Sequence, residues 1–250
     1  METNNGLDEQ AEALGRLISN AKRVVFFGGA GVSTESGIPD FRSVDGLYNR
    51  QYDYPPETIL SHTFFMAKTT EFYRFYRNKM LFDPTVIRPN GAHLALARLE
   101  AQGKMDGTGV VTQNIDGLHT AAGSETVWEL HGSIHRNRCM RCGRSYPLSA
   151  IAGNEGIPRC TCGGIIKPDV VLYEECLDDD VIEGAVNAIR RADLLIIGGT
   201  SMTVYPAAGL VGYFNGSRIA VINRDETGAD GDADLVIRHP IAKVLEKAVK

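Results

Sequence analysis

Short apolar runs that end in polar, glycine-bearing clusters recur four times in this chain and constrain its fold most strongly. The runs are rich in Val, Ile and Phe, as expected of parallel strands buried on both faces. In an open α/β sheet, ligands bind beyond the carboxyl ends of the strands, so the clusters are predicted to form one composite binding site. The runs span residues 23–27, 110–112, 194–197 and 219–222, and the clusters that follow them span 28–31, 113–116, 198–201 and 223–225.

The composition indicates a globular protein. The chain has 250 residues, of which 43% are hydrophobic and 23% charged, and no apolar stretch approaches the roughly 18 residues of a membrane helix. The first ten residues are polar and acidic and lack a signal-peptide pattern, which predicts a cytoplasmic location. A net charge of −5 argues against a nucleic-acid partner. The acidic runs at 174–180 and 230–234 indicate solvated loops, or an attraction for a basic peptide.

The order of patterns along the chain predicts a discontinuous α/β domain with two insertions. Helices are expected over 8–20, about 60–81, 93–102 and 179–191, and a further strand over 127–130. After residue 191 we expect a strand, a glycine turn, a helix and a closing strand. The large domain should comprise 1–37, 84–132 and 178–250, with a helical insertion at 38–83 and a zinc-binding insertion at 133–177. The aromatic-rich helical insertion is expected to pack a small core of its own rather than to form an aromatic cofactor box.

The first glycine turn differs from the standard dinucleotide fingerprint, because its third glycine, Gly37, comes too late for Gly-x-Gly-x-x-Gly. Small residues there would still let backbone N–H groups approach a pyrophosphate, and a helix N-terminus would add positive potential. A plain strand-to-helix turn explains the turn equally well. Asn223, after a later strand, is a better candidate than any residue near the turn for binding the adenosine ribose.

Four of the five cysteines form two close pairs, Cys139 with Cys142 and Cys160 with Cys162. In a chain without a secretion signal this pattern favours metal over disulfides, and four thiolates in two knuckles predict a closed, structural zinc site. Four unligated buried thiols are the disfavoured alternative. The second pair is one residue shorter than usual, which raises a question about its geometry. Cys176 is expected to be a free thiol, and substitution as a zinc ligand is the minor alternative.

His131 stands between a predicted strand and the cysteine-bearing insertion, where two domains would meet. A lone histidine is more often structural than catalytic. Clefts between domains bind ligands, however, and a pKa near 6.5 suits histidine to general-base work.

Taken together, several strings resemble the signature motifs of the sirtuin family. They follow the family's order from about Ala13 to the C-terminus, and the longer strings exclude chance agreement. The strings are Gly-Ala-Gly-Val-Ser at 29–33, Ser-Gly-Ile-Pro-Asp-Phe-Arg at 36–42, Thr-Gln-Asn-Ile-Asp-Gly-Leu-His at 112–119, Glu-Leu-His-Gly at 129–132, Gly-Thr-Ser at 199–201, Val204 with Pro206 and Ala207, and Ile-Asn at 222–223.

The resemblance implies a Rossmann-like parallel sheet with a small domain that combines zinc-binding and helical segments. It further implies an enzyme of the acyltransferase class that uses NAD to remove acetyl, or another neutral acyl group, from protein lysine. The products would be nicotinamide, O-acyl-ADP-ribose and free lysine. The implied cofactors are NAD and one structural zinc ion per chain. The implied partners are acyl-lysine proteins or peptides, with no nucleic acid and no membrane, and we expect a monomer.

The resemblance also assigns roles to individual residues. His131 would be the general base, Asn114 would orient the ribose and a water, and Asp116 would hold the nicotinamide carboxamide with the backbone of Ile115. Phe41 would cover the sugar face, and Ser33 and Arg42 would lie near the phosphates and ribose. The remaining cofactor residues would be Ala30, Gly31, Thr34, Gln113, Gly199, Thr200, Ser201, Asn223 and Ile241. Val170, Val171 and Tyr173 would pair with the substrate peptide by β-augmentation.

Acyl preference is partly predictable from the same resemblance. Relatives that prefer succinyl-type acids carry Tyr-x-x-Arg in the helical insertion, whereas here Tyr76 follows Tyr73 at that spacing and Arg77 comes one residue later. An acidic acyl group is therefore disfavoured. Many relatives have Phe-Gly-Glu where this chain has Tyr173, Glu174 and Glu175, a change that alters the loop beside the acyl channel.

Two other functions remain open at this point. One is ADP-ribosyl transfer or simple NAD hydrolysis from the same site, which would release nicotinamide without any acyl-lysine. The other is a non-catalytic module that senses NAD and binds a partner. The presence of Asn114, Asp116 and His131 together favours the deacylase.

Overall fold

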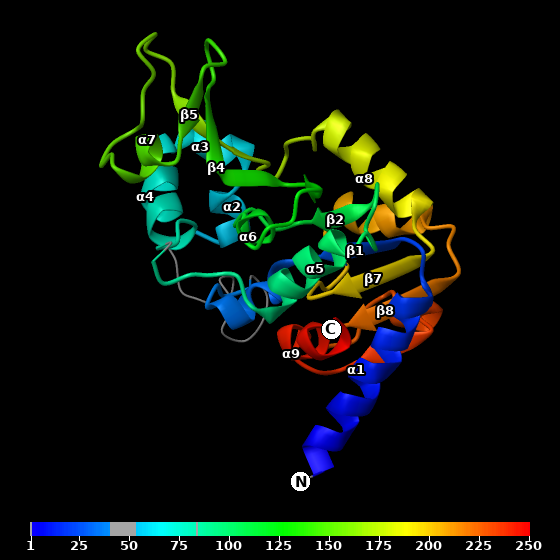
Figure 1. The fold of residues 1–250 in the computed structure, drawn as a ribbon. Coiled ribbons are helices and arrows are strands. Elements are labelled where there is room, and N and C mark those ends of the chain that lie inside the picture. Colours follow the sequence, from blue (N-terminus) through cyan, green and yellow to red (C-terminus); the bar gives the residue numbers. More distant parts are fainter. Residues whose placement is uncertain (1, 41–53, 84) are drawn as a thin grey trace.

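The centre of the protein is a six-stranded sheet in which every neighbouring pair is parallel (Figure 1). The computed structural model describes residues 2–40, 54–83 and 85–250. The strand order is β3-β2-β1-β7-β8-β9, so the chain order reverses on the two sides of β1. This is the order of a doubly wound Rossmann-like sheet. The strands are β1 (Val24–Gly28), β2 (Gly109–Thr112), β3 (Val127–Glu129), β7 (Leu194–Gly198), β8 (Arg218–Ile222) and β9 (Leu235–Ile237).

Helices cover both faces of this sheet, which explains why its strands are apolar on both sides. Along β1, Phe26 packs into the core on one face and Phe27 into the core on the other, and neither is exposed. The first face is covered by α1 (Glu2–Asn20), α5 (Gly91–Ala101) and α9 (Ile241–Ala248), and the second by α8 (Asp179–Arg191) and the 3₁₀ segment η4 (Ala207–Tyr213). Every residue of β1, β2 and β7 is buried, as predicted for central parallel strands.

A second, smaller unit stands above one end of the sheet in Figure 1. It contains an antiparallel three-stranded sheet in the order β5-β4-β6 and several short helices. The members are β4 (Gly132–Cys139), β5 (Ser145–Pro147), β6 (Ile166–Val170), α2 (Pro56–Ile59), α3 (His62–Ala67), α4 (Thr69–Lys79) and α7 (Ser149–Ala152).

The aromatic side chains of the helical insertion pack a core, as predicted, but they share it with the second insertion. Phe65, Phe72 and Tyr76 are fully buried together with Ile134 and Ile151 of the cysteine-bearing segment. The two insertions are therefore joined by one apolar cluster. The domain boundaries given above stay a prediction.

Several elements differ from the sequence-based expectation for local reasons. α1 begins at Glu2, six residues earlier than expected. The helix expected over 60–81 is divided, because Ser61 caps a new helix through a bond from the Phe64 N–H and Lys68 separates α3 from α4. The helix expected before the last predicted strand is the 3₁₀ segment η4, and β9 and α9 were not predicted. No helix in the described ranges is long and apolar enough to cross a membrane.

Candidate active site and metal centre

The carboxyl ends of four neighbouring strands form one edge of the large sheet (Figure 1). Gly28, the last residue of β1, is paired with Thr112 of β2 and with Gly198 of β7, and Gly198 is paired with Ile222 of β8. The four polar clusters therefore start side by side, as predicted. The chain order reverses between β1 and β7, the position at which doubly wound sheets bind ligands.

The turns that follow β1 and β7 pack directly on each other. Gly31 donates its N–H to the carbonyl oxygen of Gly199 at 2.8 Å, and Gly29 donates to Gly198 at 3.3 Å. A Cβ on Gly31 would lie 2.8 Å from the Cα of Gly199, so glycine is needed for the two turns to meet. Both N–H groups already donate within the protein. They are therefore not free to bind a pyrophosphate, and the predicted phosphate site must use other donors. Residues 30–36 form two 3₁₀ turns, η1 (Ala30–Val32) and η2 (Thr34–Ser36), instead of the α-helix that was considered there.

A buried polar network holds the side chains that follow β2. The Ser33 hydroxyl, in a residue only 1% exposed, donates to Asp116 Oδ2 at 2.7 Å and accepts from Asn114 Nδ2 at 3.1 Å. Asp116 Oδ1 accepts the N–H of Leu118, at the start of α6 (Leu118–Ala121), at 2.9 Å. The Asn114 N–H donates to Thr112 Oγ1 at 3.0 Å. Ser33, expected near the phosphates and ribose, uses its hydroxyl here to fix Asn114 and Asp116.

His131 lies directly beyond β3 and next to this network. Its Nδ1 is 2.9 Å from the carbonyl oxygen of Gln113. Because a carbonyl oxygen only accepts, Nδ1 carries the hydrogen and Nε2 keeps a free lone pair. Burial lowers the pKa of His131, and the bond to Gln113 raises it only in part. A neutral imidazole with an unprotonated Nε2 is the state that a general base requires.

The candidate substrate segment is bonded to His131 itself. Val170 ends β6 and is paired with Gly132 of β4, and Val171 donates its N–H to the carbonyl oxygen of His131 at 3.0 Å. Tyr173 is 38% exposed, whereas Val170 is only 7% exposed. The segment is thus held in fixed register with the candidate base.

Gln113 connects the two halves of the candidate cofactor site. Its Nε2 reaches across β1 and donates to Thr200 Oγ1, beyond β7, at 3.0 Å. Thr200 is 7% exposed and Ser201 is exposed. Asn223 is half-buried at the end of β8, and Ile241, at the start of α9, is 5% exposed within the core.

Two contacts tie the first turn to the C-terminal part of the chain. Arg224 donates to Thr34 Oγ1 at 3.4 Å, and that hydroxyl donates to the carbonyl oxygen of Gly31 at 3.0 Å. The Glu35 carboxylate accepts the N–H of Ala242, in the first turn of α9, at 2.8 Å. The first turn is therefore completed by residues from the loop after β8 and from α9.

The remaining candidates of the cofactor set are more dispersed. Ala30 is half-buried at the start of η1. Ile115 is half-buried and packs against the core of the smaller unit. Phe41 and Arg42 lie outside the described residues.

Three histidines near Asp116 were not singled out from the sequence. The rings of His93 on α5 and His119 on α6 lie 4.7 Å apart, and His135 Nε2 is 3.0 Å from the Asp116 carbonyl oxygen. Among the described residues, neither ring nitrogen of His119 has a hydrogen-bond partner. Burial lowers the pKa of His93 to about 4 and that of His119 well below its usual range, so both are neutral. In the sequence, a histidine within the apolar pattern of a helix cannot be distinguished from an ordinary core residue, so no pattern indicated that these histidines lie beside Asp116.

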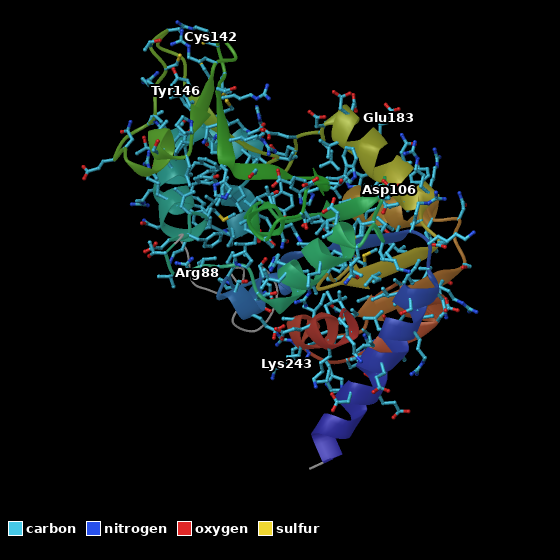
Figure 2. The ribbon with its side chains drawn as sticks, in the orientation of Figure 1. Arg88, Asp106, Cys142, Tyr146, Glu183 and Lys243 are labelled. Carbon is cyan, nitrogen blue, oxygen red and sulfur yellow. The ribbon has the colours of Figure 1, made fainter. Side chains whose placement is uncertain are left out.

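The four paired cysteines converge at the far end of the smaller unit, where Figure 2 labels Cys142 and Tyr146. All four sulfur atoms lie within 4.8 Å of one another, with Cys139 3.5 Å from Cys162 and Cys142 3.6 Å from Cys160. Zn–S bonds of about 2.3 Å in a tetrahedron require sulfur atoms about 3.8 Å apart. The cysteines are therefore positioned to bind one zinc ion, and the short second pair does not prevent convergence.

Hydrogen bonds to sulfur support this metal centre. Cys139 Sγ accepts the Arg141 N–H at 3.4 Å, and Cys160 Sγ accepts the Cys162 N–H at 3.5 Å and the Tyr146 hydroxyl at 3.0 Å. The Cys162 N–H and the Tyr146 hydroxyl lower the pKa of Cys160 to about 5, which favours the thiolate that binds metal. Cys176 is exposed and lies outside the cluster.

Known proteins share this sequence and fold along nearly the whole chain. The model of the Sir2 family matches residues 29–206. An NAD-dependent protein deacetylase of Clostridium acetobutylicum is 55% identical over 96% of this chain and 98% of its own length, and one of Clostridium perfringens is 53% identical over 97% and 100%.

Solved structures agree with the sequence matches. A complex of a Sir2 variant with a deacetylated p53 peptide and 3′-O-acetyl ADP ribose has a TM-score of 0.86 and 32% identity, and covers 96% of this chain and 100% of that one. A Sir2 homologue bound to NAD has a TM-score of 0.85 and 38% identity, and covers 95% and 92%. The similarity in sequence and in fold leads to one conclusion: the chain belongs to the Sir2 family.

Proposed function

We propose that this chain is an NAD-dependent protein deacetylase that removes acetyl groups from lysine side chains and yields nicotinamide, O-acyl-ADP-ribose and free lysine. The observation that carries this proposal is the 55% identity to a deacetylase over 96% of the chain. The neutral His131 beside the Asn114 and Asp116 network supports it independently, because it supplies the base that the reaction needs.

The residues present fit NAD. Each carboxylate oxygen of Asp116 accepts one hydrogen bond inside the protein and keeps a second lone pair for an amide N–H of the nicotinamide carboxamide. Asn114, fixed by Ser33, orients the nicotinamide ribose, and Thr200, Ser201 and Asn223 hold the adenosine half. When bound, NAD supplies the ribose carbon to which the acyl oxygen is transferred as nicotinamide leaves.

The chain's own residues manage the proton and the peptide. His131 Nε2 takes a proton from a ribose hydroxyl, and the Gln113 carbonyl keeps the ring in the required tautomer. The peptide adds its backbone at Val171, next to His131. The Val171 N–H is bonded to His131, and both backbone groups of Tyr173 are bonded to Leu60 and His62, so among these groups of the described structure the Val171 carbonyl oxygen is the one left for the peptide. The zinc ion is structural, because four thiolates close its coordination sphere.

A neutral acyl group fits this chain better than an acidic one. The Tyr73 hydroxyl donates to the Ile166 carbonyl oxygen at 2.6 Å, and the Arg77 guanidinium donates to the carbonyl oxygens of Ile151 and Gly156 at 2.8 Å and 2.5 Å. The two groups that could bind an acyl carboxylate are thus used within the protein. Tyr76 is fully buried, and its hydroxyl has no hydrogen-bond partner among the described residues. The cytoplasmic location and the monomeric state stay predictions.

The test is an assay with an acetyl-lysine peptide, with and without NAD. We expect deacetylation only with NAD, and one nicotinamide released per acetyl group removed. His131→Ala should lower kcat/KM by about 10²–10⁴-fold, the usual contribution of a general base, while His239→Ala serves as the matched control.

Other outcomes of this assay would replace the proposal. Nicotinamide release that does not depend on acyl-lysine would favour NAD hydrolysis or ADP-ribosyl transfer. Tight NAD binding without turnover on any acyl peptide would favour a binding module. Undiminished deacetylation by His131→Ala would contradict the role given to His131.

A further inference from the structure

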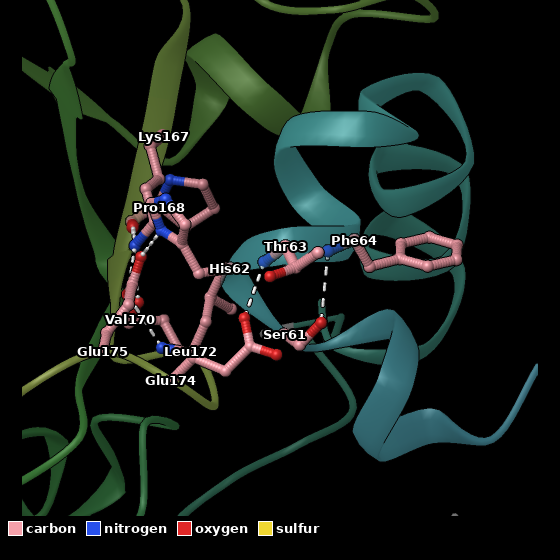
Figure 3. Close-up of polar contacts among 10 residues, drawn as sticks. All are labelled: Ser61, His62, Thr63, Phe64, Lys167, Pro168, Val170, Leu172, Glu174 and Glu175. Atoms are coloured by element: carbon pink, nitrogen blue, oxygen red, sulfur yellow. Dashed lines mark hydrogen bonds and ion pairs between the residues drawn. The ribbon is translucent and has the colours of Figure 1, made fainter.

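The N-terminus of α3 is docked on the end of the candidate substrate segment (Figure 3). A helix leaves its first N–H groups without intrahelical partners. Here the His62 N–H donates to the Tyr173 carbonyl oxygen at 3.0 Å, and the Thr63 N–H donates to a Glu174 carboxylate oxygen at 2.8 Å. The Tyr173 N–H in turn donates to the Leu60 carbonyl oxygen at 3.0 Å. We call residues 61–63 and 173–175 together the latch.

The Glu175 carboxylate is the centre of the latch, and it binds three residues: one on α3, one on β6 and one in the loop that follows β6 (Figure 3). Its Oε1 lies 2.9 Å from His62 Nδ1 on α3. Its Oε2 accepts from Lys167 Nζ on β6 at 2.9 Å and from the Leu172 N–H at 2.9 Å. Lys167 Nζ also donates to the carbonyl oxygen of Val170 at 2.9 Å. Glu175 and Lys167 therefore hold the backbone on both sides of Val171.

The ion pair between Glu175 of the latch and Lys167 of β6 is sheltered from solvent. The side chains of Glu175 and Lys167 are 20% and 17% exposed. Burial alone raises the pKa of Glu175, but the bonds from His62, Leu172 and Lys167 outweigh it and leave that pKa below its usual value. Glu175 is thus a carboxylate with its hydrogen-bonding partners already in place, unlike an exposed surface pair that contributes little.

The backbone of the latch is held in a conformation that side-chain-bearing residues rarely adopt. Glu174 has a φ of 75°, and Met202, beside Thr200, has 57°. These are the only non-glycine residues with positive φ in the part of the chain that the structure describes. Such conformations persist where the surroundings enforce them, and they are concentrated in ligand-binding segments. Both lie in segments that the proposed function assigns to ligands, one to the peptide and one to NAD.

We propose that Glu175 is a positioning residue for the acyl-lysine peptide: through Lys167, the Leu172 N–H and His62, it fixes the edge at residues 170–173, where the Val171 carbonyl oxygen is available to the peptide. The proposal rests on the proposed function. It follows from the connection of that edge to the reaction centre, because Val171 is bonded to the His131 carbonyl oxygen. Glu175 acts on the backbone of residues 170–173 and not on NAD or the reacting atoms, so its effect should fall on peptide binding.

The experiment compares steady-state kinetics of the full-length, zinc-loaded protein and its variants on an acetyl-lysine peptide. Glu175→Gln keeps the size of the side chain and removes its charge. We expect it to raise KM for the peptide about tenfold, equal to ~1.4 kcal/mol, while kcat and KM for NAD stay within about twofold. Anisotropy of a labelled acetyl peptide without NAD should report the same loss of affinity.

Variants of Lys167 supply the second arm of the test. Lys167→Met should raise KM for the peptide as Glu175→Gln does, whereas Lys167→Arg, which keeps the ion pair, should stay near the wild-type value. The double variant Glu175→Gln with Lys167→Met should cost less than the sum of the two single variants, because both remove the Glu175–Lys167 ion pair. Glu183→Gln, on the exposed face of α8 (Figure 2), is the matched control with no expected effect.

Each outcome decides the question. An unchanged peptide KM in Glu175→Gln overturns the proposal. So does an equal change in kcat and in the KM for NAD accompanied by a lower unfolding temperature, since that pattern marks a purely structural contact. If Glu175→Gln fails to fold, Lys167→Met and Lys167→Arg decide the question in the same way, by whether the KM for the peptide changes while kcat and the KM for NAD do not. A wild-type protein that removes no acetyl group under any condition refutes the proposed function instead.

Discussion

At the scale of single residues, the environment of His131 makes a prediction about pH. Burial disfavours the charged imidazolium and lowers the pKa of His131 from 6.5, and the bond to Gln113 opposes this only in part. The neutral base should therefore persist to lower pH than a free histidine would allow. We expect kcat/KM for peptide deacetylation to stay flat at neutral pH and to fall on acidification with an apparent pKa below 6.5. A pH–rate profile measures this, and an acid limb centred at or above 6.5 would disagree with it.

The buried pair of His93 and His119 makes a prediction about stability. Their pKa values are lowered in the folded protein, so the unfolded chain binds protons first as the pH falls. Their contribution is fully present above pH 6.5 and is lost between that value and the folded pKa, which is about 4 for His93. At pH 5, His93 alone should reduce the free energy of unfolding by roughly 2 kcal/mol relative to pH 7.

His119→Leu isolates the second histidine of this pair. Both ring nitrogens of His119 lack partners in the described structure, so an apolar replacement removes unsatisfied polar atoms. Urea unfolding at pH 7 and pH 5 should show a smaller loss of stability on acidification than in the wild type. An identical loss in both proteins would show that His119 does not titrate with unfolding.

Much of the site, but not its internal hydrogen bonding, could be predicted from the sequence. The clusters after β1, β2, β7 and β8 were expected together, because parallel strands end at one edge. The bond between Ser33 and Asp116, however, joins residues 83 positions apart, and it depends on how two loops pack rather than on any local pattern. No role was predicted for His93, or for His119 at the end of the 112–119 string, because buried histidines within helices follow the same apolar pattern as core residues.

At the scale of elements, the predictions succeeded where a long apolar helix pattern was bounded by a residue that caps the helix. α8 spans Asp179–Arg191 as expected, and the Asp178 side chain accepts from the N–H groups of Asp180 and Val181. β9 was missed because three residues at the edge of a sheet offer no periodicity. The break at Lys68 was missed because aromatic residues continue on both sides of it, so the apolar pattern of α3 and α4 reads as one helix.

At the scale of the whole molecule, the separation of the two sheets makes a prediction about zinc removal. The apolar cluster around the metal centre has only Cys139, Cys160 and Ile166 as buried members, so zinc should hold that end of the β5-β4-β6 sheet together. The single tryptophan, Trp128, lies in the other sheet, on β3, where it packs against Gly184 of α8. Chelation should abolish deacetylation, because β4 begins directly after His131 and β6 ends directly before Val171. It should leave the emission of Trp128 unchanged.

The zinc experiment follows metal release, activity and tryptophan emission during titration with a chelator. Readdition of zinc should restore activity. Full activity in zinc-free protein would contradict a structural metal, and a coincident change in Trp128 emission would show that the two sheets unfold as one unit.

The contact between Glu35 and Ala242 has a consequence for folding during synthesis on the ribosome. The first turn is translated early, but the Glu35 carboxylate can form its bond only after Ala242 of α9, 207 residues later, has been synthesised. At 5–20 residues per second, the ribosome needs about 10–40 s to cover that distance. The central strand β1 likewise cannot pair on this side until β7, in the second half of the chain, has been synthesised. A nascent chain that has not yet reached α9 should therefore have no finished nucleotide turn, and catalytic competence should arrive only after α9 has been synthesised.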